Sequence, residues 1–219
     1  MLKVIEIFKS IDGEGIRTGY PVTFIRLQGC NCRCSYCDTK YSYDNYKYIN
    51  MTIDEIIKEI RDYKSRRITL TGGEPLYQPE AADLIHKLLE QGFEVNIETN
   101  GSIDLEEFLG EDSFHENLII TMDWKSISSN MSQHMVVSNL YNLRKQDVLK
   151  FVVGDDQDLD QMRDIISSKP LKCNIFVSPV FGKIEPREIV EYILDNDLED
   201  VRIQLQLHKI IWNPETRGV

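Results

Sequence analysis

The stretch Cys30-Asn-Cys-Arg-Cys-Ser-Tyr-Cys37 holds four of the five cysteines of the chain, and it follows the apolar run Val22–Gln28. Three of these cysteines, Cys30, Cys34 and Cys37, have the spacing C-x3-C-x2-C. Three thiolates on one short loop can bind three irons of a 4Fe-4S cube and leave the fourth iron open to a small molecule. The run before them is rich in β-forming residues, so we expect the loop to follow a strand.

Zinc and disulfides are the other common uses of closely spaced cysteines. A structural zinc site usually draws its ligands from two separated segments, and outside the loop the chain has only Cys173. Disulfides are typical of secreted proteins, and the sequence does not open on a charged segment followed by an apolar one. We therefore expect a reduced, cytoplasmic protein, with zinc as the weaker alternative. Cys32 is interpreted as a spare thiol, because the two cysteines of a C-x-C pair do not face one cube comfortably.

The composition is typical of one globular domain. The 219 residues are 42% hydrophobic, which is enough for one sizeable core, and no apolar run reaches the length of a membrane span. The net charge of −11 disfavours a nucleic-acid partner, because the only basic cluster is the short segment Lys64–Arg67. We expect a small-molecule or protein substrate, and neither nucleic acid nor a membrane as a partner.

Strand patterns alternate with helix patterns along the chain. Eight runs predict strands, at about residues 3–8, 22–28, 68–71, 93–98, 118–122, 148–153, 173–178 and 201–207. Helices are predicted at about residues 52–63, 79–92, 136–144, 159–167 and 187–196. This alternation indicates an α/β fold with a parallel sheet and helices outside it. A closed barrel of eight units usually takes about 250 residues, so we predict an incomplete TIM-type (β/α) barrel.

In such a fold the chemistry belongs at the C-terminal ends of the strands. Several predicted strands end in polar or glycine-rich segments: Gly72-Gly73-Glu74-Pro75, Thr99-Asn-Gly101, Asp123-Trp-Lys125-Ser126, Ser178-Pro179 and Gln206-Leu-His-Lys209. A glycine pair alone is more often a plain turn. Five such strand ends, all expected at the same edge of the sheet as the cysteine loop, indicate a functional site.

The cysteine spacing, with Tyr36 before the last cysteine and Gly72–Pro75 one strand later, resembles the radical S-adenosylmethionine superfamily. The resemblance implies that a 4Fe-4S cluster binds the methionine moiety of S-adenosylmethionine at its open iron. One electron then cleaves the sulfonium and gives a 5'-deoxyadenosyl radical, while the protein orients the reactants. A flavodoxin- or ferredoxin-type protein is the implied electron donor.

Narrower motifs resemble one family within that superfamily, the 7-carboxy-7-deazaguanine synthases. They are Ser10-Ile-Asp-Gly-Glu-Gly15, Gly19-Tyr-Pro21, Phe24-Ile-Arg-Leu-Gln-Gly-Cys30, Cys37-Asp-Thr39, Thr71-Gly-Gly-Glu-Pro75 and Gln206-Leu-His-Lys209. The resemblance implies conversion of 6-carboxy-5,6,7,8-tetrahydropterin to 7-carboxy-7-deazaguanine with loss of ammonia, a step toward queuosine-type tRNA bases. It also implies a single radical S-adenosylmethionine domain over residues 1–219, a Mg2+ ion and a possible homodimer.

The same resemblance assigns site residues. The cluster ligands are Cys30, Cys34 and Cys37, and Thr39 binds Mg2+ through its hydroxyl. The substrate contacts are Ile11, Asp12, Gly13, Arg26, Thr71 and His208. The S-adenosylmethionine contacts are Tyr36, Cys37, Asp38, Gly73, Asp123, Lys125, Ser126, Ser178, Pro179, Val180 and Phe181. No side chain is assigned to catalysis beyond the cluster-bound S-adenosylmethionine.

Three of these assignments have a plainer alternative. Arg26 alternates with Ile25 and Leu27, so it could point into the barrel mouth and bind a carboxylate with two prongs, or form a surface salt bridge. The Thr39 hydroxyl suits Mg2+, a hard ion that prefers oxygen ligands, or it caps a turn. A lone histidine such as His208 is often structural, although this one is expected at the functional end of the last strand.

Two features depart from the family pattern. Asp12 stands where many members have Gln, which would present a charged acceptor to the pterin. The chain continues past Pro214 with Glu-Thr-Arg-Gly-Val219, where some members end. Two other functions stay open, a glycyl-radical-enzyme activase and a non-enzymatic iron-sulfur or zinc-binding protein. The N-terminal Asp-Gly-Glu-Gly motif disfavours the first, and the ordered strand ends disfavour the second.

Overall fold

The computed structural model describes residues 1–44, 47–168 and 170–219. These residues form one sheet of nine strands in the order β3-β1-β2-β4-β5-β6-β7-β8-β9. The strands are β1 (Leu2–Ile11), β2 (Pro21–Leu27), β3 (Ile49–Met51), β4 (Arg67–Gly72), β5 (Glu94–Thr99), β6 (Leu118–Trp124), β7 (Val148–Val153), β8 (Asn174–Pro179) and β9 (Val201–Ile203). β3 and β9 are the two edges, so the sheet is not closed, and the predicted incomplete barrel is confirmed.

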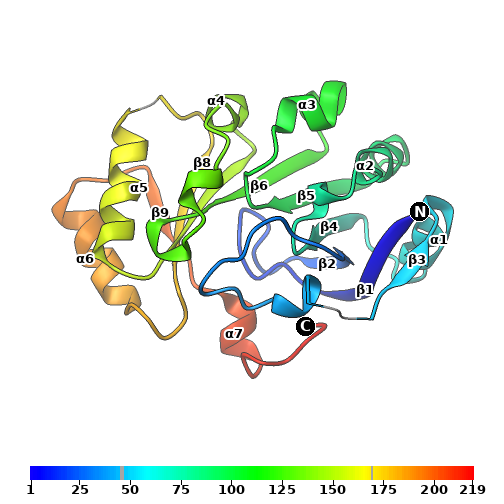
Figure 1. Ribbon diagram of the computed structural model, residues 1–219, viewed down its shortest axis with the longest axis horizontal. Helices are drawn as coiled ribbons and strands as arrows, with labels where there is room; N and C mark the ends of the chain where they lie inside the picture. The colour runs from blue at the N-terminus through cyan, green and yellow to red at the C-terminus, as the bar shows by residue number, and fades with distance from the viewer. Residues whose placement is uncertain (45–46, 169) are drawn as a thin grey trace.

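Seven α-helices and five 3-10 segments connect the described strands. The helices are α1 (Ile53–Asp62), α2 (Ala81–Glu90), α3 (Leu105–Leu109), α4 (Asn139–Asn142), α5 (Asp156–Ser168), α6 (Pro186–Asp195) and α7 (Leu207–Ile211). The 3-10 segments are η1 (Lys40–Ser42), η2 (Pro75–Tyr77), η3 (Gly110–Phe114), η4 (Ile127–Ser129) and η5 (Ser132–His134). Helices α1, α2, α5 and α6 lie outside the curved sheet, whereas α7 lies on the opposite side with the C-terminus (Figure 1).

The sheet opens with an antiparallel hairpin and is parallel thereafter. β1 pairs antiparallel with both β2 and β3. From β2 onward each strand runs parallel to the next, with Arg26 opposite Thr71 and Thr99 opposite Met122. Because parallel strands end at the same edge, the loops after β2, β4, β5, β6, β7 and β8 all emerge on one side of the molecule.

Alternation along the strands gives the sheet an apolar outer face. Ile25, Leu70, Ile97 and Phe151 are fully buried in one hydrophobic cluster with the helices. Helix α1 begins with the predicted capping box at Thr52, whose hydroxyl accepts a hydrogen bond from Glu55 N, and it buries one apolar stripe in this cluster. The intervening strand residues face the concave side, which is largely polar.

Two sequence-based expectations about the elements are wrong. The helix expected at residues 136–144 is only the single turn Asn139–Asn142. The strand expected at 201–207 ends at Ile203, and Leu207 begins helix α7, so His208 lies on a helix rather than at a strand end. Short apolar runs do not distinguish a strand from a helix by periodicity, and packing against other segments decides which one forms.

A buried ion pair fills the concave side below the strand ends. The Asp12 carboxylate accepts hydrogen bonds from Arg17 Nε (2.8 Å) and Thr69 Oγ1 (2.7 Å). Arg17 also donates to the carbonyl oxygens of Ile68 (3.1 Å) and Glu94 (3.2 Å). Arg17 therefore ties the N-terminal loop to the beginnings of strands β4 and β5.

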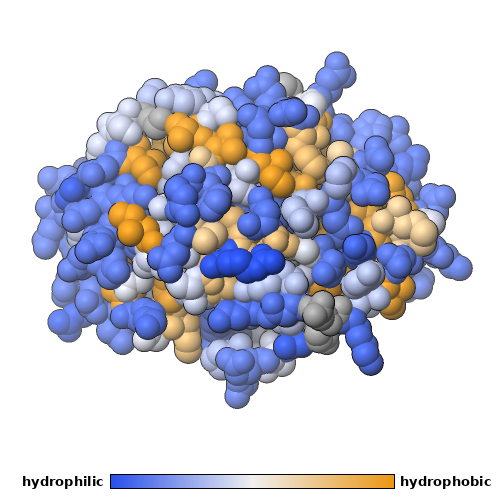
Figure 2. Space-filling model, viewed as in Figure 1, coloured by the Kyte–Doolittle hydropathy of each residue, from blue (hydrophilic) through white to orange (hydrophobic). Residues whose placement is uncertain are grey.

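No helix in the described ranges is long and apolar enough to cross a membrane. The face shown in Figure 2 is mainly hydrophilic, and its hydrophobic groups lie between polar ones rather than in one continuous area.

We predict that replacing Arg17 with Met lowers the free energy of unfolding by about 3–5 kcal/mol near neutral pH, because it leaves Asp12 as an unpaired buried charge. Burial raises the pKa of Asp12 from 3.8 to about 6 even with Arg17 present. A carboxyl group whose pKa is higher in the folded than in the unfolded protein lowers the free energy of unfolding as the pH rises from the unfolded-state pKa through the folded-state pKa. The free energy of unfolding lost in the variant should therefore be larger at about pH 7 than at about pH 5, which lie about one unit above and below the pKa of Asp12.

Urea unfolding of the reconstituted protein, followed by circular dichroism, measures both effects. The double variant Asp12→Asn/Arg17→Met carries no titratable group at this position, so its own free energy of unfolding should lack the pH-dependent contribution that Asp12 makes over this range. An Arg17→Met variant as stable as wild type at neutral pH would show that the pair contributes nothing.

Candidate active site

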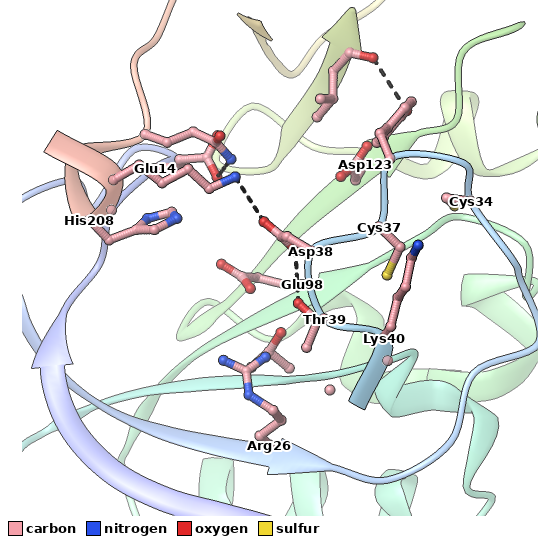
Figure 3. A pocket seen from close by; sticks show the side chains of 18 of the residues that line it. Glu14, Arg26, Cys34, Cys37, Asp38, Thr39, Lys40, Glu98, Asp123 and His208 are labelled. Atoms are coloured by element: carbon pink, nitrogen blue, oxygen red, sulfur yellow. Dashed lines mark hydrogen bonds and ion pairs between the residues drawn. The ribbon is translucent and has the colours of Figure 1, made fainter. Parts of the chain in front are cut away.

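A cavity of about 620 Å³ opens at the carboxyl ends of the parallel strands. Its walls come from the concave face of the sheet, the cysteine loop, helix α7 and the segment Pro214–Val219. The labelled side chains in Figure 3 converge on it from both sides, with the cysteines at one side and Arg26 and His208 at the other. One enclosed space can therefore hold a cofactor and a substrate next to each other.

Hydrogen bonds from the Arg33 side chain and from backbone amides order the cysteine loop. Arg33 Nη1 donates hydrogen bonds to the carbonyl oxygens of Cys30 (2.8 Å) and Cys32 (2.7 Å), and Cys37 N donates to Cys34 O (3.2 Å). Ser35 N donates to Ser129 O (3.0 Å), which joins the loop to η4. These bonds fix the course of the loop so that the thiols of Cys30, Cys34 and Cys37 all line the cavity.

The three thiols fit the donor set of a 4Fe-4S cluster. All three are partly exposed, whereas Cys32, which also lines the cavity, is only 2% exposed. In the described part of the chain, no three His, Cys, Asp or Glu side chains lie close enough together to hold one metal ion. A cube needs no such convergence, because each thiolate binds a different iron. Burial raises the pKa of the Cys30 and Cys34 thiols to about 11, so cluster binding must displace their protons.

The glycine turn after β4 packs directly against this loop. A Cβ atom on Gly73 would lie 2.5 Å from Gly29 O and 2.6 Å from Cys30 Cβ, so only glycine fits this close approach. Glu74, which follows it, is fully buried, and its carboxylate accepts hydrogen bonds from Asn100 N (2.6 Å) and Thr99 Oγ1 (2.9 Å). Burial raises the pKa of Glu74 to about 7. Glu74 is a structural link between the loops after β4 and β5.

Asn100 connects the loop after β5 to Cys30. Its Oδ1 accepts a hydrogen bond from Ser102 N (2.9 Å), which fixes the orientation of the amide. Its Nδ2 then donates to Asn31 Oδ1 (3.1 Å) and contacts Cys30 Sγ (3.9 Å). The loop after β5 is therefore in contact with the cysteine loop.

Arg26 lies in the cavity wall, with its side chain only 16% exposed, and projects toward Thr39 and Glu98 (Figure 3). Its Nε donates to Glu6 Oε1 (2.7 Å), which fixes the plane of the guanidinium. The salt bridge considered as the alternative thus exists, with Arg26 in the cavity wall and Glu6 partly buried beside it. No other protein acceptor for Arg26 lies among the described residues, so its terminal nitrogens can bind a ligand.

Thr39 and Asp38 present oxygen atoms to the same space. Thr39 Oγ1 donates to Asp38 Oδ1 (2.8 Å), and Asp38 Oδ2 pairs with Lys209 Nζ (2.9 Å). Enclosure by the cavity wall would raise the pKa of Asp38, but the Lys209 ammonium outweighs it and lowers the pKa to about 2. Asp38 is therefore ionised, and with Thr39 it forms an oxygen-rich edge suited to a hard cation.

Four alternating charges span the floor of the cavity. Lys150 Nζ lies 3.1 Å from Glu14 Oε2 and 3.8 Å from Asp123 Oδ2, which is 3.0 Å from Lys125 Nζ. Burial would raise the pKa of Glu14 and lower those of the lysines, but the opposite charges reverse each effect, so all three groups stay ionised. Asp123 Oδ1 is buried without a protein partner among the described residues, so it can accept a hydrogen bond from a ligand.

The structure gathers most of the predicted site residues around the cavity. They are Ile11, Gly13, Arg26, Cys30, Cys34, Tyr36, Cys37, Asp38, Thr39, Thr71, Gly73, Asp123, Lys125, Val180, Phe181 and His208. The Gly13 backbone packs so closely on the His208 ring that a Cβ atom there would clash with it. Burial lowers the pKa of His208, so its imidazole is mainly neutral at pH 7 and able to accept a proton.

Four predicted residues do not line the cavity. The Asp12 side chain is 2% exposed and bound to Arg17, so the expectation that it presents a charge to the pterin is corrected. Ser126 is fully buried and donates to Val152 O (3.2 Å). Ser178 is also fully buried and donates to Glu14 Oε1 (3.0 Å). Pro179 ends strand β8 and is buried. These residues support the wall from behind.

Several cavity residues were given no role by sequence reasoning. Glu14, Asn100 and Gln206 line the cavity and stand in motifs noted in the sequence, whereas Glu98 and Lys150, which also line it, were missed. The alternation of Glu94, Asn96 and Glu98 with Val95 and Ile97 was a signal that polar side chains of β5 face inward. Lys150 gave a weaker signal as the one charged residue in an apolar strand.

Comparisons with known proteins agree with this geometry. The Radical SAM superfamily profile matches residues 24–148. Two curated relatives are named 7-carboxy-7-deazaguanine synthase. The protein from Clostridium acetobutylicum is 48% identical, covering 99% of each chain, and the one from Methanospirillum hungatei is 41% identical, covering 97% of this chain and 86% of the relative.

Solved structures show the same fold. A crystal structure of QueE from Escherichia coli superposes with a TM-score of 0.75 at 23% identity, covering 94% of each chain. Streptococcus suis SuiB bound to its precursor peptide SuiA superposes with a TM-score of 0.61 at 14% identity, covering 84% of this chain and 48% of SuiB. With its cysteine loop, partial barrel and full-length relatives, the chain belongs to the 7-carboxy-7-deazaguanine synthase family of the radical S-adenosylmethionine superfamily.

Proposed function

We propose that the protein converts 6-carboxy-5,6,7,8-tetrahydropterin to 7-carboxy-7-deazaguanine with release of ammonia, in the queuosine pathway. The observation that carries this proposal is that the cysteine loop and the inward-facing Arg26 share one cavity in a chain of this family. The bound cluster would supply the electron that cleaves S-adenosylmethionine to a 5'-deoxyadenosyl radical. The protein is thus an enzyme, and the alternatives of an activase and of a metal carrier are not supported.

The cofactor side of the cavity has groups that suit S-adenosylmethionine. The backbone at Gly73 is accessible because the residue has no side chain, and it lies against the cysteine loop. Tyr36 and Asp38 flank Cys37 on the cavity wall, while Val180 and Phe181 offer apolar surface for an adenine ring. Asp123 and Lys125 supply paired charges that can bind the ribose and methionine ends. Ser126, Ser178 and Pro179 would act by holding this wall.

The substrate side has groups that suit a carboxylated pterin. The Arg26 guanidinium can take the carboxylate, and Thr71 and the backbone of Ile11 and Gly13 lie nearby in the wall. Glu14 and Glu98 can accept hydrogen bonds from pterin nitrogens, and neutral His208 can accept a proton at its ring. Thr39 would hold Mg2+ against substrate oxygens, with Asp38 helping to orient the Thr39 hydroxyl.

Other properties follow from this assignment. We infer that residues 1–219 act as one domain, that the protein is cytoplasmic, and that a flavodoxin- or ferredoxin-type protein donates the electron. A homodimer fits the exposed apolar side chains on α6 and α7, including Leu194 and Ile210. Cross-linking and sedimentation of the reconstituted protein test the dimer.

The test of function is anaerobic reconstitution with iron and sulfide, followed by incubation with reductant, S-adenosylmethionine, Mg2+ and the carboxylated pterin. The expected products are 7-carboxy-7-deazaguanine and ammonia, detected by mass spectrometry; because loss of ammonia is redox-neutral, S-adenosylmethionine should not be consumed in proportion to product. Cleavage of S-adenosylmethionine with no deazaguanine formed from the pterin would contradict the substrate assignment.

Replacing Cys30, Cys34 or Cys37 with Ala is expected to remove the cluster and all turnover, because each thiolate would bind a separate iron. Cys32→Ser should retain most of both, since its buried side chain is not among the proposed ligands. Iron content and visible absorbance after reconstitution measure the cluster. If Cys32→Ser loses the cluster as completely as Cys34→Ala, the ligand assignment is wrong.

Replacing Thr39 with Ala should weaken the response of product formation to Mg2+ and leave the cluster and uncoupled cleavage of S-adenosylmethionine largely intact. The hydroxyl belongs to the substrate side, so loss of it removes one metal ligand without touching the cysteines. Titrations of Mg2+ with wild type and variant make the comparison. Unchanged Mg2+ dependence would assign the Thr39 hydroxyl to the turn instead.

Replacing Arg26 with Ala should lower kcat/KM by roughly one to two orders of magnitude, since a sheltered charge-assisted pair is worth about 1.5–3 kcal/mol. Lysine keeps the positive charge but cannot bind a carboxylate through two parallel N–H groups, so Arg26→Lys should recover only part of the loss. Glu6→Gln is the matched control for the salt bridge and should lower kcat/KM less than Arg26→Ala does. If both Arg26 variants bind the carboxylated pterin like wild type, Arg26 is structural.

A further inference from the structure

The sulfur of Cys30 has N–H groups from two different segments beside it. Cys32 N donates to Cys30 Sγ (3.4 Å) from within the cysteine loop. Asn100 Nδ2, from the loop after β5, lies 3.9 Å from the same sulfur, within reach of a long hydrogen bond to this large and weak acceptor. The second donor therefore reaches Cys30 only through the tertiary structure.

The orientation of the Asn100 amide is fixed by its neighbours. Asn100 Oδ1 accepts hydrogen bonds from Ser102 N (2.9 Å) and Ser102 Oγ (2.6 Å). A backbone N–H can only donate, so the amide oxygen faces Ser102 and the amide nitrogen faces Cys30. Asn31 Oδ1 also accepts from Asn100 Nδ2 (3.1 Å), and Asn31 Nδ2 donates to Ser102 Oγ (2.8 Å). Turning the amide over would break its bonds to Ser102 N and to Asn31.

Asn100 is buried, and its backbone is fixed independently of its side chain. The residue is only 5% exposed, so water has little access to replace its amide as a donor. Its backbone N donates to the buried carboxylate of Glu74 (2.6 Å). A reduced cluster carries one more negative charge than an oxidised one, so hydrogen bonds to its sulfur ligands stabilise the reduced form and raise the reduction potential.

We propose that the Asn100 side-chain amide donates to the Cys30 thiolate and raises the reduction potential of the cluster. The step concerned is the transfer of one electron from an external low-potential donor, which is oxidised, to the cluster, which is reduced, and no bond forms or breaks. Asn100 acts through Cys30 and is a positioning residue. The inference rests on the proposed assignment of Cys30 as a cluster ligand and does not depend on the identity of the substrate.

A redox titration of the reconstituted protein tests the proposal. The electron paramagnetic resonance signal of the reduced cluster is followed against solution potential, without S-adenosylmethionine or pterin. Asn100→Leu removes the N–H donor at similar volume, changes no charge and keeps the backbone bond to Glu74. The ratio of reduced to oxidised cluster at a fixed potential should fall about three- to tenfold. The midpoint should then be about 30–60 mV more negative, because a tenfold change is about 59 mV for one electron.

Asn96→Leu is the matched control. Asn96 lies on β5, is also 5% exposed, and accepts a hydrogen bond from Thr121 Oγ1 (2.9 Å). Among the residues that the structure describes, it has no hydrogen bond to a cysteine. Its replacement removes a buried amide from the same part of the fold, so the stability should fall while the midpoint potential stays at the wild-type value.

A second measurement uses the wild-type sequence. Protein labelled with 15N at the side-chain amides of asparagine should show coupling of 15N to the reduced cluster in pulsed electron paramagnetic resonance. The coupling should be lost in Asn100→Leu and also in Asn100→Asp, which keeps the shape of the side chain. Because wild type needs no substitution to fold, absence of the coupling there overturns the proposal even where a variant binds no cluster.

The outcomes separate this inference from the proposed function. If wild type binds no cluster, or Cys30→Ala keeps one, the ligand assignment fails and the inference with it. If Asn100→Leu binds the cluster with the midpoint potential of wild type, the inference alone is overturned. An equal fall in Asn96→Leu would also overturn it, because the shift would then come from a general disturbance of β5.

Discussion

The parallel alignment of the strands from β2 to β9 is the constraint on which this active site depends. Because parallel strands end at one edge, the cysteine loop, the glycine turn after β4 and the polar residues after β5, β6 and β8 meet around one cavity. The sheet stays open at β3 and β9, which lets α7 and the C-terminal segment lie across the concave side. A fully closed barrel would fill that space with side chains.

The concave face can be polar only because its charges are paired. Unpaired buried charges cost several kcal/mol each in rough terms, and here Asp12 pairs with Arg17, and Glu14 and Asp123 pair with Lys150. The Asp12 pair closes the cavity from below. The Glu14–Lys150–Asp123–Lys125 series keeps the floor ionised and hydrogen-bonding, so the reacting molecules meet fixed charges rather than bulk water.

The two halves of the site are connected through the structure rather than along the sequence. On the cofactor side, Glu74 and Asn100 join two strand loops to the cysteine loop. On the substrate side, Lys209 joins helix α7 to Asp38, which directly follows the last cysteine. The cysteine loop is therefore in contact with both halves of the site.

The sequence by itself determined the α/β class, the incomplete barrel, the cysteine loop and Arg26, because cysteine spacing and strand alternation are local signals. It placed Asp12 in contact with substrate and His208 at the end of a strand, and the structure corrected both. Glu98 and Lys150 were recognised as site residues only in the folded molecule, since one charged residue in a strand does not show which segments it faces. Tertiary structure decided their role, because a side chain's partners are set by which distant segments the sheet brings together.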